Sequence, residues 1–222
     1  MSCPFISYLI TTKNTGFELQ FLLERLHKYG QNNECIILDD YSDDPVTLQV
    51  LNNVSDNSFF KVHKHKLDRN YSEHKNYGKS FCKGEYIFQI DDDELPTETL
   101  LENLNDILEL NGDVELFWIP RINDFKGVNN QNAAQWGWKL SPYEDRLIVN
   151  WPDPQGRLFK NLPHIEWKRR LHEKIEGNKT YVHLPTTFEL SLHHNKTIEK
   201  QIQTNIKYNK LFTEEENKGF KV

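Results

Sequence analysis

Over the first 120 residues, short apolar runs alternate with segments whose apolar residues recur at helical spacing. Runs of this kind predict buried strands, and the helical spacing predicts amphipathic helices. Strands are expected over 5–11, 35–38, 59–63, 86–90 and 114–119. Helices are expected over 19–29, 45–54, 72–82 and 96–108. This alternation is typical of an α/β protein with a mostly parallel central sheet covered by helices on both faces.

The pattern changes after Arg121. Residues 122–170 are rich in Trp, Asn, Pro and charged residues and show little periodicity, which predicts a long, loop-dominated stretch. Long loops inside a compact chain are usually functional, so we expect a functional role for this stretch. A short strand is expected from Thr187 to His194, followed by a helix over 196–212. We expect one domain over 1–222, with a regular half over 1–121 and an irregular half over 122–222.

The composition narrows the class of protein. With 222 residues the chain can bury one substantial core, and its net charge of -6 argues against a nucleic-acid partner. No apolar run is long enough for an integral membrane segment. The start, Met1–Phe5, lacks the basic and apolar parts of a secretion signal. Three irregularly spaced cysteines, Cys3, Cys35 and Cys82, fit a reducing, cytoplasmic location.

Polar residues follow three of the predicted strands. They are Thr11, the pair Asp39-Asp40, and the run Asp91-Asp92-Asp93. Ligands of open parallel sheets bind at the carboxyl ends of the strands, so these side chains are expected to share one edge. Asp39 or Asp40 could there accept a hydrogen bond from a nucleobase.

The acidic run is the strongest candidate for a metal site. Neighbouring carboxylates repel each other, so they are stable when solvated, at a helix N-terminus, or on a cation. Asp91 and Asp93 can present oxygens to one Mg²⁺ or Mn²⁺ ion, whose coordination a substrate diphosphate would complete. Glu94, just before Pro96, is expected to be a helix-start residue instead.

Several motifs, in this order and spacing, resemble family 2 glycosyltransferases. They are Ser7–Asn14, Asp39–Ser42, Lys75–Gly78 with Lys83–Ile87, and Asp91–Asp93. The segments Trp151–Lys160 and Leu171–Glu173 are similar to the branch that contains lipopolysaccharide-core β-glucosyltransferases. The resemblance covers residues 5–210.

The resemblance implies a GT-A fold with a nucleotide-sugar-binding half over 1–121 and an acceptor-side half over 122–222. It places Thr11 and Asp40 at the nucleoside. Lys75 stands where the family often has Arg near the base or the diphosphate, and this change keeps the charge but loses the bidentate fork.

Within the acidic run, the resemblance implies that Asp93 is the firmest metal ligand. Asp91 contacts the metal or the ribose, and Asp92 belongs to the donor-binding set. His172 is expected to complete the metal shell or to contact the diphosphate, with a structural hydrogen bond as the alternative.

On the acceptor side, a carboxylate must take the proton from the acceptor hydroxyl. Asp153 is the predicted base, with a turn residue as its alternative role and Glu173 and Asp145 as the reserves. Arg157 is expected to orient the loop or the donor phosphates, or to form a salt bridge. At most one of His193 and His194 can face the site.

Trp136, Trp138 and Trp151 are expected to form a sugar platform or to pack in a core. The predicted function is an inverting, metal-dependent transfer of a hexose, with glucose expected, from a UDP-sugar to a glycan or another hydroxyl acceptor. One alternative is a nucleotidyltransferase, although Thr11–Gly16 is a poor match to a glycine-rich phosphate loop. The other is a non-catalytic nucleotide-sugar or carbohydrate-binding module.

Overall fold

A seven-stranded sheet forms the centre of the protein, in the order β13-β6-β10-β4-β1-β2-β3. The computed structural model describes residues 5–30, 32–213 and 216–217. All neighbouring strands of this sheet are parallel except where β10 runs against β4 and β6. The strands are β1 (Ile6–Thr12), β2 (Glu34–Asp39), β3 (Phe60–Lys64), β4 (Tyr86–Asp91), β6 (Leu116–Ile119), β10 (Gln155–Lys160) and β13 (Tyr181–His183).

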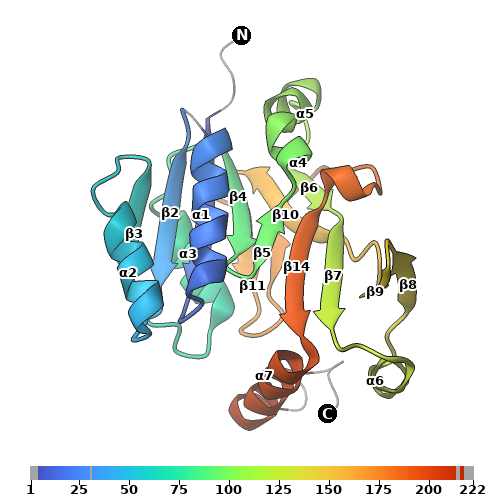
Figure 1. Ribbon diagram of the computed structural model, residues 1–222. Coiled ribbons are helices and arrows are strands. Elements are labelled where there is room, and N and C mark those ends of the chain that lie inside the picture. The colour runs from blue at the N-terminus through green and yellow to red at the C-terminus, as the bar shows by residue number, and fades with distance from the viewer. Residues whose placement is uncertain (1–4, 31, 214–215, 218–222) are drawn as a thin grey trace.

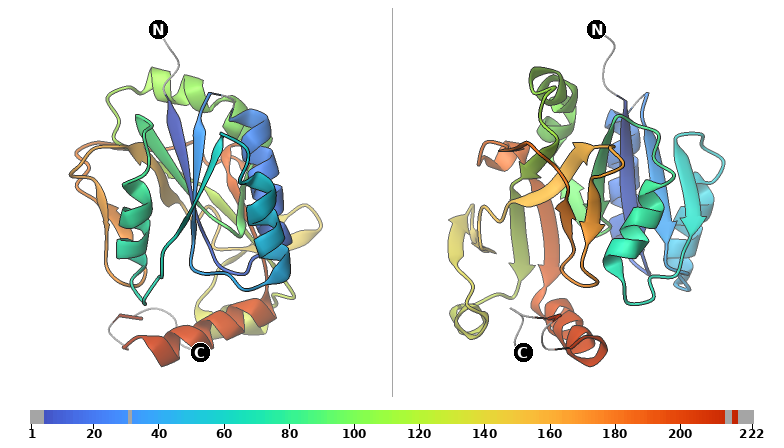
Figure 2. Two further views of the ribbon diagram at one scale, coloured as in Figure 1. Left: turned by 90° about the vertical axis from the view of Figure 1, so that its left-hand side faces the viewer. Right: turned by 180° about the vertical axis from the view of Figure 1, so that it is seen from behind.

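Helices cover both faces of this sheet (Figures 1 and 2). Residues alternate between the two faces of a strand, so Ile6 and Ile10 of β1 pack with the leucines of α1, whereas Leu9 packs in a second core with Ile36 and Ile87. The helices are α1 (Phe17–Tyr29), α2 (Pro45–Val54), α3 (Tyr71–Lys79), α4 (Glu98–Glu102), α5 (Leu104–Leu110), α6 (Asn130–Trp136) and α7 (Ile198–Leu211). The predicted mostly parallel α/β fold is confirmed.

The expected helix from Pro96 begins later and is interrupted. Pro96 ends the short strand β5 (Glu94–Pro96), and α4 begins at Glu98 with the Thr97 side chain as its cap. A second helix, α5, starts after Asn103. The prediction that Glu94 starts a helix is wrong, because its side chain is buried in β5.

A second sheet lies beside the first, in the order β5-β14-β7-β9-β8 (Figure 1). Its further strands are β7 (Arg121–Lys126), β8 (Leu140–Tyr143), β9 (Arg146–Val149) and β14 (Leu192–Thr197), and the short helix η1 covers Phe188–Leu190. A two-stranded sheet pairs β11 (Glu166–Lys168) with β12 (Lys174–Glu176). The segment 122–170 is therefore more ordered than its aperiodic sequence predicts. Its strands β7 and β10 pair with distant segments, whereas β8 and β9 form a local pair.

The expectations for the start of the chain and for Cys3 concern residues that the structure does not describe. Met1–Pro4, with Cys3, lie outside the described residues; Cys35 and Cys82 are buried free cysteines. Among the described helices, none combines the length and the apolar character that crossing a membrane requires.

Candidate active site

A cleft of about 330 Å³ opens at the carboxyl ends of β1, β2 and β4. Thr11 and Asp91 are paired neighbours on β1 and β4, and Asp40 directly follows β2. The helix α7 contributes Lys207 and Tyr208 to the lining of the cleft. The sequence-predicted residues that line the cleft are Thr11, Asp40, Lys75, Asp91, Asp92, Asp93, Glu173, His172 and His194. The expected meeting of the three strand ends at one edge is thus confirmed.

Asp91 is held between the basic side chains of Lys75 and Arg157. Its Oδ1 accepts hydrogen bonds from Lys75 Nζ at 3.0 Å and from Gln89 Nε2 at 2.8 Å, and its Oδ2 contacts Arg157. Burial acts to raise the pKa of Asp91, but the charges of Arg157 and Lys75 outweigh it and hold the pKa well below its usual range. Asp91 is therefore an ionised carboxylate whose charge these cations already compensate.

Glu94 connects the two sheets beneath the cleft. Its Oε1 lies 2.9 Å from Arg121 Nη1 and 2.6 Å from Arg157 Nη2. Its Oε2 accepts the backbone N–H of Asp91 at 3.2 Å. The carboxylate is fully buried, so these bonds replace the hydration that burial removes. It fixes the turn that carries the acidic run.

Asp92 is the acid of the run whose ionisation the fold opposes. Burial and the negative charge of Asp93 raise the pKa of Asp92 to about 7. Its Oδ2 accepts the backbone N–H of Lys13 at 3.2 Å and contacts the Thr15 hydroxyl. These bonds tie the turn after β4 to the loop after β1.

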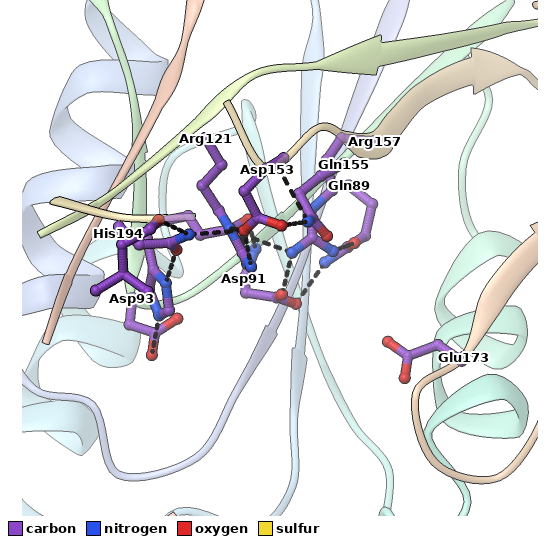
Figure 3. Close-up of polar contacts among 12 residues, drawn as sticks. Gln89, Asp91, Asp93, Arg121, Asp153, Gln155, Arg157, Glu173 and His194 are labelled. Carbon is purple, nitrogen blue, oxygen red and sulfur yellow. Dashed lines mark hydrogen bonds and ion pairs between the residues drawn. The ribbon is translucent and has the colours of Figure 1, made fainter. Parts of the chain in front are cut away.

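Asp93 lies beside His194, with 3.5 Å between Oδ2 and Nε2 (Figure 3). Burial acts to raise the pKa of Asp93, but the nearby His194 ring lowers it overall. The other ring nitrogen of His194, Nδ1, lies 2.8 Å from Oδ1 of Asn123. His193 is not among the residues that line the cleft, so the prediction that at most one of the two histidines faces the site is confirmed.

Asp153 contacts Arg121 and Asn123, but it is not among the residues that line the cleft. Its Oδ2 accepts hydrogen bonds from Arg121 Nη2 and Asn123 Nδ2, both at 2.7 Å (Figure 3). Its Oδ1 accepts one from Gln155 Nε2 at 3.1 Å. Both carboxylate oxygens therefore have donors from the protein.

The side of the cleft next to β2 is built around Asp40 and α3. Asp40 Oδ1 accepts the backbone N–H of Leu67 at 3.0 Å, and its Oδ2 lies 3.1 Å from Lys13 Nζ. The neighbouring His74 is buried, and this burial together with the charge of His65 lowers its pKa to about 4. A neutral imidazole thus faces the cleft beside Asp40.

Lys75 and the Leu171–Glu173 segment close the side of the cleft next to α3. The Lys75 side chain is 3% exposed, and its Nζ lies 2.7 Å from Glu173 Oε1 as well as 3.0 Å from Asp91. Burial acts to lower the pKa of Lys75, but the charges of Asp91 and Glu173 raise it overall. His172 lines the same wall, with 3.2 Å between its Nε2 and Asn217 Oδ1.

The remaining sequence candidates have structural contacts. Arg157 forms the buried salt bridges that its alternative role predicts. Trp136 and Trp138 pack around Phe125, and Trp151 stacks on Phe188. Asp145, the reserve base, has a 92% exposed side chain. None of these residues is among those that line the cleft.

Sequence reasoning missed Arg121 and Asn123, and it misassigned Glu94. No local signal marks them, because Asn is frequent throughout this chain and Arg121 simply follows a strand. They come together only through the pairing of β7 with β14 and of β14 with β5.

Solved structures share this fold. S. aureus TarS 1–349 aligns with a TM-score of 0.58 at 16% identity, over 86% of this chain and 60% of that chain. The same protein in complex with UDP-GlcNAc gives a TM-score of 0.57 at 16% identity, over 86% of this chain and 58% of that one. The chain therefore spans about 60% of the length of these structures.

No curated protein matches the sequence. The family described as "Glycosyl transferase family 2" matches residues 7–155, which include the three strand ends, the acidic run and Asp153. This match covers more than half of the chain. Together with the GT-A-like fold, it shows that the chain belongs to glycosyl transferase family 2.

Proposed function

We propose that this glycosyltransferase transfers a hexose, with inversion, from a UDP-sugar to a hydroxyl acceptor such as a glycan. The observation that carries the proposal is the cleft at the strand ends, where Thr11, Asp40 and the acidic run converge and Asp93 lies beside His194. The likeness to S. aureus TarS, for which complexes with UDP-GlcNAc and with UDP are known, supports a uridine donor. UDP-glucose is the donor to test first, because the branch resemblance points to a glucosyltransferase.

The residues present fit a divalent cation of the Mg²⁺ or Mn²⁺ type. Within the described part of the chain, no group of three or more His, Cys, Asp or Glu side chains could hold a metal. Asp93 and His194 would supply two ligands, and diphosphate oxygens and water would supply the rest, as is usual for these cations. His194 takes the place beside Asp93 that the sequence reserved for His172, and His172 remains a proposed diphosphate contact.

The leaving nucleoside diphosphate gains negative charge as its bond to the sugar breaks. A cation on Asp93 and His194 would stabilise that charge as a Lewis acid. Lys196, two residues after His194 on the same face of β14, and Lys207 of α7 line the cleft and add positive charge. Asp91 orients the ribose side of the donor while Lys75 and Arg157 balance its charge.

The acceptor hydroxyl must lose its proton to a carboxylate. We propose Asp153 for this step and Glu173 as the alternative. Asp153 would first have to exchange a hydrogen bond from Arg121 or Asn123 for the acceptor hydroxyl. Glu173 already lines the cleft and is engaged by Lys75 through Oε1.

The central test is release of UDP from UDP-glucose, UDP-GlcNAc and other UDP-sugars with Mn²⁺ present. Asp93→Ala is expected to lower this rate by at least ~10³-fold, because it removes the carboxylate ligand of a cation that bears leaving-group charge. Asp106→Ala, an exposed acid on α5, is the matched control. Turnover that survives both chelator and Asp93→Ala would exclude the metal-dependent mechanism. Tight UDP-sugar binding with no turnover would favour the non-catalytic module.

The base is tested with the matched amides Asp153→Asn and Glu173→Gln. Loss of the base is expected to lower kcat by ~10²–10⁴-fold while the affinity for UDP stays close to that of the wild type. The residue whose amide variant shows this split is the base. A loss of UDP affinity in either variant would instead assign that residue to donor binding.

A further inference from the structure

Asn123 occupies a buried position between the predicted base and the proposed metal ligand. It lies on β7, and its side chain contacts both Asp153 and His194. The residue is 4% exposed, so its amide must find partners within the protein. The chemistry of these partners decides which way the amide faces.

The orientation of the Asn123 amide follows from groups that can only accept. Its Nδ2 lies 2.7 Å from Asp153 Oδ2 and 3.1 Å from the carbonyl oxygen of Val149. An ionised carboxylate and a backbone carbonyl have no proton to give, so the amide NH₂ must face them. Arg121, which also donates to Asp153 Oδ2, holds that carboxylate in place.

The amide oxygen therefore faces His194. Asn123 Oδ1 lies 2.8 Å from His194 Nδ1, and a carbonyl oxygen can only accept, so Nδ1 must carry a proton. In the neutral ring the other nitrogen, Nε2, then holds a lone pair. That nitrogen lies 3.5 Å from Asp93 Oδ2, on the cleft side of the residue.

We propose that Asn123 is a positioning residue that fixes neutral His194 in its Nδ1–H tautomer and turns the Nε2 lone pair toward Asp93. This inference rests on the proposed function in one respect, which is that a cation uses that lone pair. Hydrogen-bond partners of this kind hold a ligating imidazole in the required tautomer and orientation. Asp153 thereby gains a second role, because it orients the amide that orients the histidine.

The tautomer can be measured without metal, donor or turnover. Long-range ¹H–¹⁵N correlation spectra of the ¹⁵N-labelled, metal-free chain at about pH 8, where imidazole is neutral, show which ring nitrogen bears the proton. The chain has 9 histidines, so the spectrum of His194→Gln assigns the signal. The proton is expected on Nδ1 in the wild type, and a proton on Nε2 alone would overturn the inference.

Two substitutions separate the hydrogen bond from the space that the side chain fills. Asn123→Leu is similar in size and has no acceptor, so Nε2–H is expected to form and to donate to Asp93, and Mn²⁺ affinity is expected to fall about 10–100-fold. Asn123→Asp keeps an acceptor for Nδ1–H and should retain the wild-type tautomer. Asn52→Leu, an exposed site on α2, is the control for the substitution itself.

The outcomes distinguish the two proposals. If the tautomer depends on Asn123 but wild-type protein does not bind Mn²⁺, the inference stands and the cation in the proposed function is excluded. If Mn²⁺ binds and Asn123→Leu changes neither the tautomer nor the affinity, the inference is overturned and the proposed function stands. The wild-type tautomer decides the matter even if Asn123→Leu does not fold.

Discussion

The two walls of the cleft are built on different principles. On one wall, Thr11, Asp40 and Asp91 lie at the ends of adjacent parallel strands, so their proximity follows from the order β4-β1-β2. On the other wall, Arg121 and His194 lie on β7 and β14, which are far apart in the sequence and pair in parallel, and Asn123 of β7 is buried next to His194. At the first wall, the carboxylate of Asp91 is paired with basic side chains of the protein. Behind the second wall, the neutral amide of Asn123 links Asp153 to His194.

The two walls therefore have different roles in the site. The strand-end wall has fixed charges that suit a polar donor, and its acid Asp91 is already compensated. In the wall formed by β7 and β14, hydrogen bonds orient the His194 ring and set which of its two nitrogens carries the proton. Glu94 joins the two walls, because one of its oxygens contacts both Arg121 and Arg157.

The largest effect is expected from breaking this junction. Glu94→Gln removes the charge of the buried carboxylate that Arg121 and Arg157 share, which should lower the free energy of unfolding by about 3–5 kcal/mol. Urea denaturation measures the loss. Glu98→Gln removes a half-exposed carboxylate that contacts Arg25 and Lys28, and its midpoint should stay close to the wild type. Equal losses in the two variants would contradict the junction role.

A second comparison sets the two candidate histidines against each other. His194→Ala is expected to weaken Mn²⁺ binding about 10–100-fold, as removal of a ligand or its support does. His172→Ala should change it less than about threefold, because we propose His172 as a diphosphate contact and not as a metal ligand. Binding of Mn²⁺ alone, measured by calorimetry, gives both values. The reverse order would return the metal role to the histidine that the sequence favoured.

The smallest effect concerns Asp92 and depends on pH. Folding raises the pKa of this carboxyl from 3.8 to about 7, so the folded state favours the protonated form. As pH rises through this window the unfolded state ionises first, so the free energy of unfolding should fall progressively, with the full loss reached above pH 7.

Asp92→Asn should abolish this part of the pH dependence. In metal-free buffer the variant is expected to match the wild type near the low end of the window and to exceed it in stability at the high end. Thermal denaturation of both proteins across the range measures the difference. A constant difference between them at every pH would show that Asp92 ionises as freely in the folded protein as in the unfolded one.

Particular residues show how far sequence reasoning could reach. Thr11, Asp40 and Asp93 were predictable because a strand end and its loop are contiguous, and the edge that they share follows from a parallel sheet. Glu94 was misassigned because a local pattern, an acid before Pro96, suggested a helix start, whereas burial between two arginines decided its role. Asp153 was recognised as important within its motif, but its partners Arg121 and Asn123 were not.

By itself the sequence determined the alternating strands and helices, the family motifs and the acidic run at the end of β4. These depend on periodicity and on neighbours in the chain, which a sequence displays directly. Only the tertiary structure decided which histidine lies beside Asp93, how the charge of Asp91 is balanced and which way Asn123 faces. Those features depend on contacts between distant segments. Where such contacts are buried, polar and charged groups need specific partners, because leaving them unpaired is costly.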